Sequence, residues 1–191
     1  MKNLFLCFAA ILFVAISNAQ IVGSNHSEYT QADTLRGSLR QERTSFDVQK
    51  YHLKLKVEPE KKFISGSNVI SFKVIYDMPR MQLDLFDNME IDSIVHQGKK
   101  LKYERKYNAV FIDFKKAIEK GSLDSLEFFY HGNPVIAKNA PWDGGFVWRE
   151  DKDGNPWVGV AVQGTGASLW YPNKDHQSDE PEEARMDIAV P

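Results

Sequence analysis

The residues of this chain that could do chemistry gather in one segment near its end, from Gln163 to Pro181. A Gly/Ala/Ser patch follows Gln163, and farther on come His176 and the carboxylates Asp175, Asp179 and Glu180. Paired carboxylates can hydrolyse glycosides, but carboxylates this close in one loop are more often turn and cap residues. We favour the structural role for them. With its glycines and its many polar side chains, the segment nevertheless resembles one wall of an active site whose other walls are missing.

The chain contains no complete catalytic motif. There is no His-Glu-x-x-His, no Gly-x-Ser-x-Gly and no nucleotide-binding glycine loop. The histidines show no metal-ligand spacing; they are His26, His52, His96, His131 and His176. Carboxylates and carbonyls in the turn Asp151 to Asn155 could bind calcium, but the turn lacks EF-hand spacing, and we favour a purely structural hairpin turn. The sequence thus predicts neither catalytic residues nor a metal site.

The N-terminus has the pattern of a secretory signal peptide over residues 1–19. A basic start precedes the apolar run Leu4 to Ile16, and small residues follow at the cleavage positions. That run is shorter than the roughly 20 residues needed to span a bilayer, so no membrane span is expected after signal removal. We expect an exported protein, periplasmic or extracellular. The only cysteine, Cys7, lies in the signal, so the mature chain must be held together by its core alone.

Charge and composition exclude some classes of partner. The chain has 24 Lys+Arg and 26 Asp+Glu, and this balance gives no reason to expect a nucleic-acid partner. Residues 20–45 are rich in polar side chains and poor in large apolar ones, and we expect an extended or mobile arm there.

From Phe46 onward the hydrophobic period is two. Tyr51 to Val57 and Phe63 to Tyr76 alternate apolar and polar residues and predict an antiparallel hairpin. Further short alternating runs are separated by polar turns, and a second hairpin is expected around Asp151 to Asn155. Only Lys115 to Lys120 is a candidate for a helical turn. The pattern predicts an all-β fold, an antiparallel multi-stranded β-sandwich or open barrel.

Several motifs occur in a recognisable order. Gln163 lies nine residues before Pro172, which opens Pro-Asn-Lys-Asp, and Met186 to Pro191 forms a last strand ending in proline. Tyr51-x-Leu-x-Leu opens the first strand. This order resembles the N-terminal domain of zinc aminopeptidases of the aminopeptidase N and leukotriene hydrolase type. The departures are Asn173 in place of a cysteine and the residues that separate Asp175 from Glu180-Pro181.

The resemblance implies that residues 46–191 form a saddle-like N-terminal β domain, truncated at its C-terminal end and inactive alone. Zinc and its ligands would lie outside this chain, in a missing C-terminal catalytic domain that would be its partner. The substrates would be peptides, with Gln163 holding the free α-amine and Gly164 and Gly166 letting the substrate backbone approach. The alternative is a secreted β-sandwich binding module for carbohydrate or protein, built around an exposed cluster of Trp142, Trp148, Trp157 and Trp170.

Overall fold

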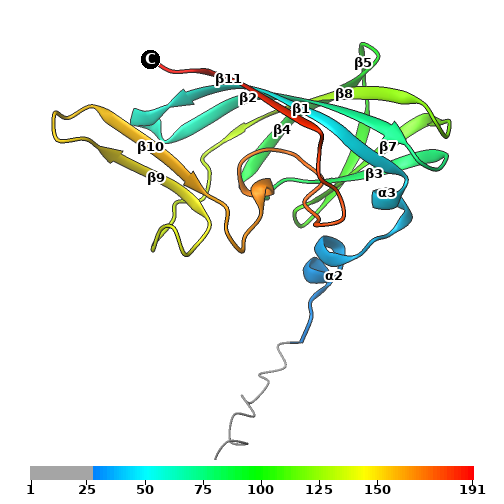
Figure 1. Ribbon diagram of the computed structural model, residues 1–191, viewed down its shortest axis with the longest axis horizontal. Coiled ribbons are helices and arrows are strands. Elements are labelled where there is room, and N and C mark those ends of the chain that lie inside the picture. Colours follow the sequence, from blue (N-terminus) through cyan, green and yellow to red (C-terminus); the bar gives the residue numbers. More distant parts are fainter. Residues whose placement is uncertain (1–27) are drawn as a thin grey trace, which may run out of the picture. The chain divides into compact units, whose positions relative to one another are not determined.

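The computed structural model describes residues 28–191, and within it Gln31–Pro191 forms one unit dominated by strands (Figure 1). The expected signal peptide and the start of the expected arm lie outside the described residues. The strands of this unit form a six-stranded, a three-stranded and a two-stranded sheet. In spatial order these are β11-β1-β2-β8-β4-β5, β3-β7-β6 and β10-β9.

The six-stranded sheet is built on the predicted first hairpin. Its strands are β1 (Phe46–Glu58), β2 (Phe63–Val74), β4 (Met89–His96), β5 (Lys99–Lys100), β8 (Leu123–Gly132) and β11 (Glu183–Ala189). β1 and β2 pair antiparallel across a short 3-10 turn, η1 (Pro59–Lys61). Tyr51, Leu53, Leu55 and Val57 are buried, as the period of two requires, so this hairpin prediction is confirmed.

The three-stranded sheet supplies the opposing side of the core. It contains β3 (Met78–Asp84), β6 (Lys102–Lys106) and β7 (Ala109–Ile118). Met81 and Leu83 of β3 and Ile112 of β7 join Phe72 and Phe128 of the larger sheet in one buried cluster. Two sheets that share a core give the sandwich-like arrangement expected from the sequence.

The second predicted hairpin is also present. β9 (Gly145–Glu150) pairs antiparallel with β10 (Pro156–Ala161). In the turn between them, Asp151 accepts hydrogen bonds from the backbone N–H groups of Asp153 and Asn155, each at 2.8 Å. The carboxylate of Asp151 thus closes the turn, in agreement with the structural role favoured for it.

The prediction of a purely antiparallel fold was wrong at its last strand. β11 runs parallel to β1, with Lys50 opposite Glu183 and Lys56 opposite Ala189, so the large sheet is mixed. A long connection between β10 and β11, residues 162–182, brings the chain back in the parallel direction. β11 is an edge strand and is exposed along its whole length. None of the sheets closes into a barrel.

The segment expected to be an extended or mobile arm is helical over part of its length. α2 (Gln31–Gly37) and α3 (Gln41–Thr44) occupy it, and Leu35 and Arg43 are buried. A few well-placed contacts therefore order this polar segment. The helical turn considered for Lys115 to Lys120 was wrong, because residues up to Ile118 belong to β7.

Among residues 28–191, no helix combines the length and the apolar character needed to cross a membrane.

Candidate functional site

The candidate site is the connection between β10 and β11, residues 162–182, and much of it is packed into the domain. It contains the short helix η2 (Ala167–Leu169), and Leu169 is fully buried in the core. In Figure 1 this orange-to-red segment lies beneath the six-stranded sheet, near α3 and β3. The N–H of Phe86 donates to the carbonyl of Ser168 at 2.9 Å. The connection is therefore fixed to the rest of the domain by core packing and backbone hydrogen bonds.

A buried ion pair fixes the middle of this connection. Arg43 of α3 donates through Nη2 to both carboxylate oxygens of Asp84 on β3, at 2.7 and 2.8 Å. Asp84 also accepts from the N–H of Asp175 at 3.2 Å, and its own backbone bridges to Asn173. Burial raises the pKa of Asp84 to about 6, against the opposing attraction of Arg43. The pair thus joins the N-terminal helices, β3 and the connection.

A second buried pair fixes the connection to β1. The ammonium of Lys174 forms an ion pair with Asp179 and donates to the carbonyl of Phe46 at 2.6 Å. Asp179 in turn accepts a hydrogen bond from the N–H of Val48 at 3.3 Å. The hydroxyl of Tyr51 accepts from the N–H of Lys174 at 3.0 Å. Asp175 and Asp179 therefore act as structural anchors, the role that the sequence favoured for the loop carboxylates.

Gly166 lies where a carboxylate comes close to the backbone. A Cβ at this position would stand 2.1 Å from Oδ2 of Asp175, and φ of Gly166 is +89°. That same oxygen accepts from Oγ of Ser168 at 2.6 Å and lies 3.8 Å from Nη2 of Arg36. Any other residue at 166 would thus have a strained backbone and would overlap the Asp175 carboxylate. The expected role of Gly166 toward a substrate stays a prediction.

Gln163 and Gly164 form an exposed turn at the start of the connection. The N–H groups of Thr165 and Gly166 donate to the carbonyl of Val162, at 3.1 and 2.9 Å. Gly164 has φ of +71°, and no atom lies within 4 Å of a Cβ built there. The Gln163 side chain is exposed and forms no hydrogen bond with another of the described residues. Its carboxamide is therefore free to meet a ligand.

Residues 28–191 do not fit a zinc ion, because no three of their His, Cys, Asp or Glu side chains come together as a metal site. Three of the histidines in this range pair with an aspartate on a neighbouring strand. His52 meets Asp187 at 2.7 Å, His96 meets Asp124 at 2.7 Å and His131 meets Asp92 at 2.9 Å. His176 contacts Ser178 and the carbonyl of Gly37. No catalytic step through a metal follows from these residues.

Comparisons with known proteins find similar solved structures but no match by sequence. No protein-family model matches the chain, and no curated protein matches its sequence. Among solved structures, an M1 zinc metallopeptidase from Deinococcus radiodurans, bound to a Tyr-Ser-Ala substrate, matches 76% of this chain at 20% identity with a TM-score of 0.54. Native yeast leukotriene A4 (LTA4) hydrolase matches 88% at 20% identity with a TM-score of 0.63. Both matches fall in the N-terminal region of those proteins.

The fold is that of the N-terminal region of M1 zinc metallopeptidases. This agrees with the resemblance seen in the sequence. The chain spans only 32% of the Deinococcus protein and 26% of the yeast protein, so the activity of those whole proteins is not established for it. At 20% identity the match shows the shared fold alone.

In this M1-type fold the four tryptophans do not form one exposed cluster. Trp148 and Trp170 pack against the core, and both lie close to Phe146, with ring centroids 5.1 and 6.1 Å away. Trp142 and Trp157 are 72% and 54% exposed. Only two of the four tryptophans are therefore available for the binding surface that was expected for a binding module.

Sequence reasoning missed Arg43, Asp84 and Lys174, the side chains that hold the connection in place. Arg43 lies in a polar segment and Asp84 at the end of an alternating run, and neither position carries a local signal. Only the tertiary fold brings them together.

Proposed function

We propose that this chain is the substrate-anchoring N-terminal β domain of an exported zinc aminopeptidase, an enzyme that removes N-terminal residues from peptides. The observation that carries the proposal is the fold shared with M1 zinc metallopeptidases over most of the chain. The motif order around Gln163 and Pro172 supports it independently. In this proposal zinc, its ligands and the general base lie in a catalytic domain beyond Pro191, and the enzyme works in the periplasm or outside the cell.

Gln163 is the proposed contact to the substrate's α-amine. A carboxamide oxygen accepts a hydrogen bond from an ammonium and so fixes the register of the first residue. The side chain is exposed and has no competing partner among the described residues. The turn that carries it continues into a connection fixed by the Arg43–Asp84 and Lys174–Asp179 pairs. Gly164, with open space on its Cβ side, leaves room for the substrate backbone.

The exposed face near the chain's last strand supports a partner domain. Met186, Ile188 and Val190 are 57%, 53% and 67% exposed. Ile188 and Val190 line a groove of about 510 Å³ whose other walls include Val158 and Trp170. Contiguous apolar surface of this kind marks an interaction site. In the proposal the catalytic domain covers it.

Two measurements test the proposal. The 191-residue chain alone, with zinc added, should not hydrolyse an aminoacyl-amide, because no three His, Cys, Asp or Glu side chains of residues 28–191 come together to hold a metal ion. Turnover by the purified chain would overturn the assignment. In the natural protein, about 100 to 150 residues after Pro191 should bring a His-Glu-x-x-His motif, which places two zinc ligands on one helical face. A natural protein without that motif would equally contradict the proposal.

The second candidate is a carbohydrate- or protein-binding module. It is favoured by one observation, the exposure of Trp142 and Trp157. Aromatic faces of this kind stack on sugar rings and on partner side chains. Trp157→Ala would then abolish binding to a glycan array, whereas the aminopeptidase proposal expects no glycan binding by this chain.

A further inference from the structure

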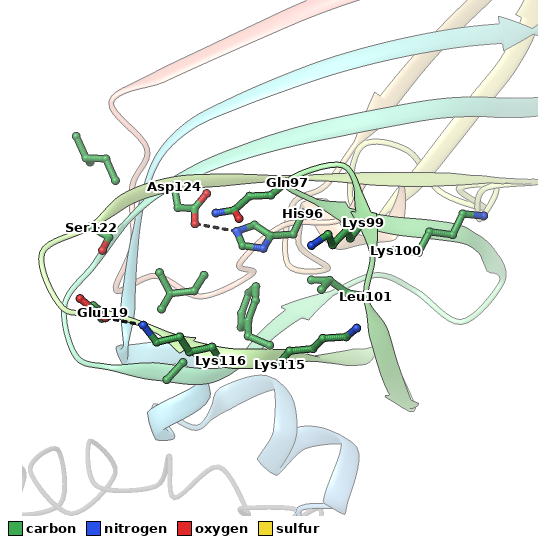
Figure 2. A pocket seen from close by; sticks show the side chains of 14 residues that line it. His96, Gln97, Lys99, Lys100, Leu101, Lys115, Lys116, Glu119, Ser122 and Asp124 are labelled. Carbon is green, nitrogen blue, oxygen red and sulfur yellow. Dashed lines mark hydrogen bonds and ion pairs between the residues drawn. The ribbon is translucent and has the colours of Figure 1, made fainter.

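A second concave feature of the domain lies where the β4–β5 turn meets the end of β7 and the turn that leads into β8. It is a cleft of about 590 Å³, and Figure 2 shows the side chains that line it. None of its lining residues belongs to the connection 162–182. Whatever this cleft does is therefore separate from the amine contact proposed for Gln163.

The cleft carries an excess of positive charge. Four lysines line it, Lys99, Lys100, Lys115 and Lys116, against two carboxylates, Glu119 and Asp124. Both carboxylates already have partners: Glu119 accepts from Lys116 at 3.0 Å, and Asp124 meets His96 at 2.7 Å. In residues 28–191, no carboxylate forms an ion pair with the other three lysines. Three of the four lysines that line the cleft therefore have no carboxylate partner among the described residues.

The local sequence has the same asymmetry. Residues 97–120 contain eight Lys and Arg and three Asp and Glu, a formal charge of 8 − 3 = +5, whereas the whole chain is at −2. The rest of the chain must then carry −2 − 5 = −7. One short segment of an acidic protein therefore holds an excess of positive charge. Two of its strands, β5 and β7, contain the lysines that line the cleft.

The lysines come from two different sheets that meet at this cleft. Lys99 lies directly opposite His96 in the β4–β5 pair, and Lys115 and Lys116 follow Phe114 at the end of β7. Phe114 is buried and packs edge-on against the His96 ring, with centroids 5.3 Å apart. This ring contact holds the two sheets together beside the lysines that line the cleft. Holding like charges side by side is unfavourable, and a bound anion relieves the repulsion.

We propose that this cleft binds a small polyanion that carries two or more phosphate or carboxylate groups. A lysine ammonium is a compact point charge on a flexible stem, and it adapts to either group without the planar, two-point geometry of arginine. The cleft volume suits a small molecule.

The test is a titration of the full chain with two probes, tripolyphosphate and citrate, at constant ionic strength set by NaCl. The backbone amide resonances of His96–Leu101 and Phe114–Glu119 should shift in the NMR spectrum and reach a plateau as the probe concentration rises. A saturable response to either probe supports the proposal; a response to one probe alone identifies the anion class, and a response to both shows that the site accepts phosphate and carboxylate groups alike. No saturable binding of either probe, or shifts spread over the whole surface, would overturn the proposal.

Variants sharpen the test. Lys99→Gln/Lys115→Gln should weaken binding about tenfold, because two charge contacts from exposed lysines are lost. Lys138→Gln/Lys152→Gln removes the same charge outside the cleft and should leave the affinity unchanged. Equal weakening by both pairs would mean attraction to overall charge and would contradict a site. All four lysines are exposed, so the melting temperatures of the variants should lie within a few degrees of that of the parent chain. The chemical-shift titration of the parent chain tests the proposal even if a variant fails to fold.

Discussion

Removal of Arg43 should strongly destabilise the domain, although Arg43 lies in a short polar helix. Its side chain is fully buried, and its partner Asp84 is only 4% exposed. Arg43→Met keeps much of the volume but leaves the Asp84 carboxylate buried without its counter-ion. Breaking a buried pair from one side costs about 3–5 kcal/mol. A domain of this size has about 5–15 kcal/mol of stability in total, so the variant should fold but unfold at much lower urea.

The double variant Arg43→Met/Asp84→Leu removes both charges. It should recover a large part of the loss, because well-packed apolar groups can replace a buried ion pair at little cost. As a matched surface control, Lys116→Met breaks the pair with Glu119, whose side chains are 85% and 75% exposed. It should change stability by less than about 0.5 kcal/mol.

The loss in Arg43→Met should also depend on pH. Burial already raises the pKa of Asp84 to about 6, and removal of Arg43 raises it further. A carboxyl whose pKa is raised in the folded state contributes stability below its unfolded pKa of about 3.8 and loses it as the pH rises through the folded pKa. The variant should therefore be more destabilised at pH 8 than at pH 5.

Urea unfolding followed by tryptophan fluorescence, at both pH values, measures these effects. A loss below about 1 kcal/mol for Arg43→Met at pH 8 would refute the buried pair as an anchor of the connection. A double variant no more stable than Arg43→Met would refute the unpaired charge as the cause.

Two further predictions concern the turns. Gly164→Ala should lower the free energy of unfolding by about 1 kcal/mol, because Gly164 has a positive φ. Gly166→Ala should lower it by about 3 kcal/mol, because its methyl group would also overlap the Asp175 carboxylate. Equal losses of the two variants in thermal unfolding would contradict that contact. Hydrogen bonds from the Asn155 side chain and backbone hold the pKa of Asp151 below 3.8. Asn155→Ala should move the NMR titration midpoint of Asp151 up toward 3.8, and the stability from this group is present above pH 3.8 and lost as the pH falls through the folded pKa.

The strands that alternate strictly in the sequence could be predicted from it. The alternating run Tyr51 to Val57 lies within β1, and β9 and β10 form the hairpin expected around Asp151. In both cases the signal is local, because a half-buried strand must present alternate residues to the core, and an aspartate turn closes through its own neighbours.

The features that sequence reasoning missed depend on residues far apart in the chain. The pairing of β11 with β1 joins residues more than a hundred positions apart, and no local period encodes the direction of such a pairing. Arg43, Asp84 and Asp175 meet only in the folded domain. The polar segment around Arg43 gave no sign of burial, because one buried ion pair and Leu35 order it where its composition predicts disorder.

The most direct test of the central claim is the kinetics of Gln163→Ala in the natural protein that carries this chain and its proposed catalytic domain. Loss of a hydrogen bond to a charged ammonium costs about 1.5–3 kcal/mol, so kcat/KM for a peptide with a free N-terminus should fall about 10- to 150-fold, mainly through a higher KM. Gln177→Ala, an exposed glutamine in the same connection, is the matched control and should behave as the parent. Unchanged kinetics for Gln163→Ala, or equal effects of the two substitutions, would contradict the account.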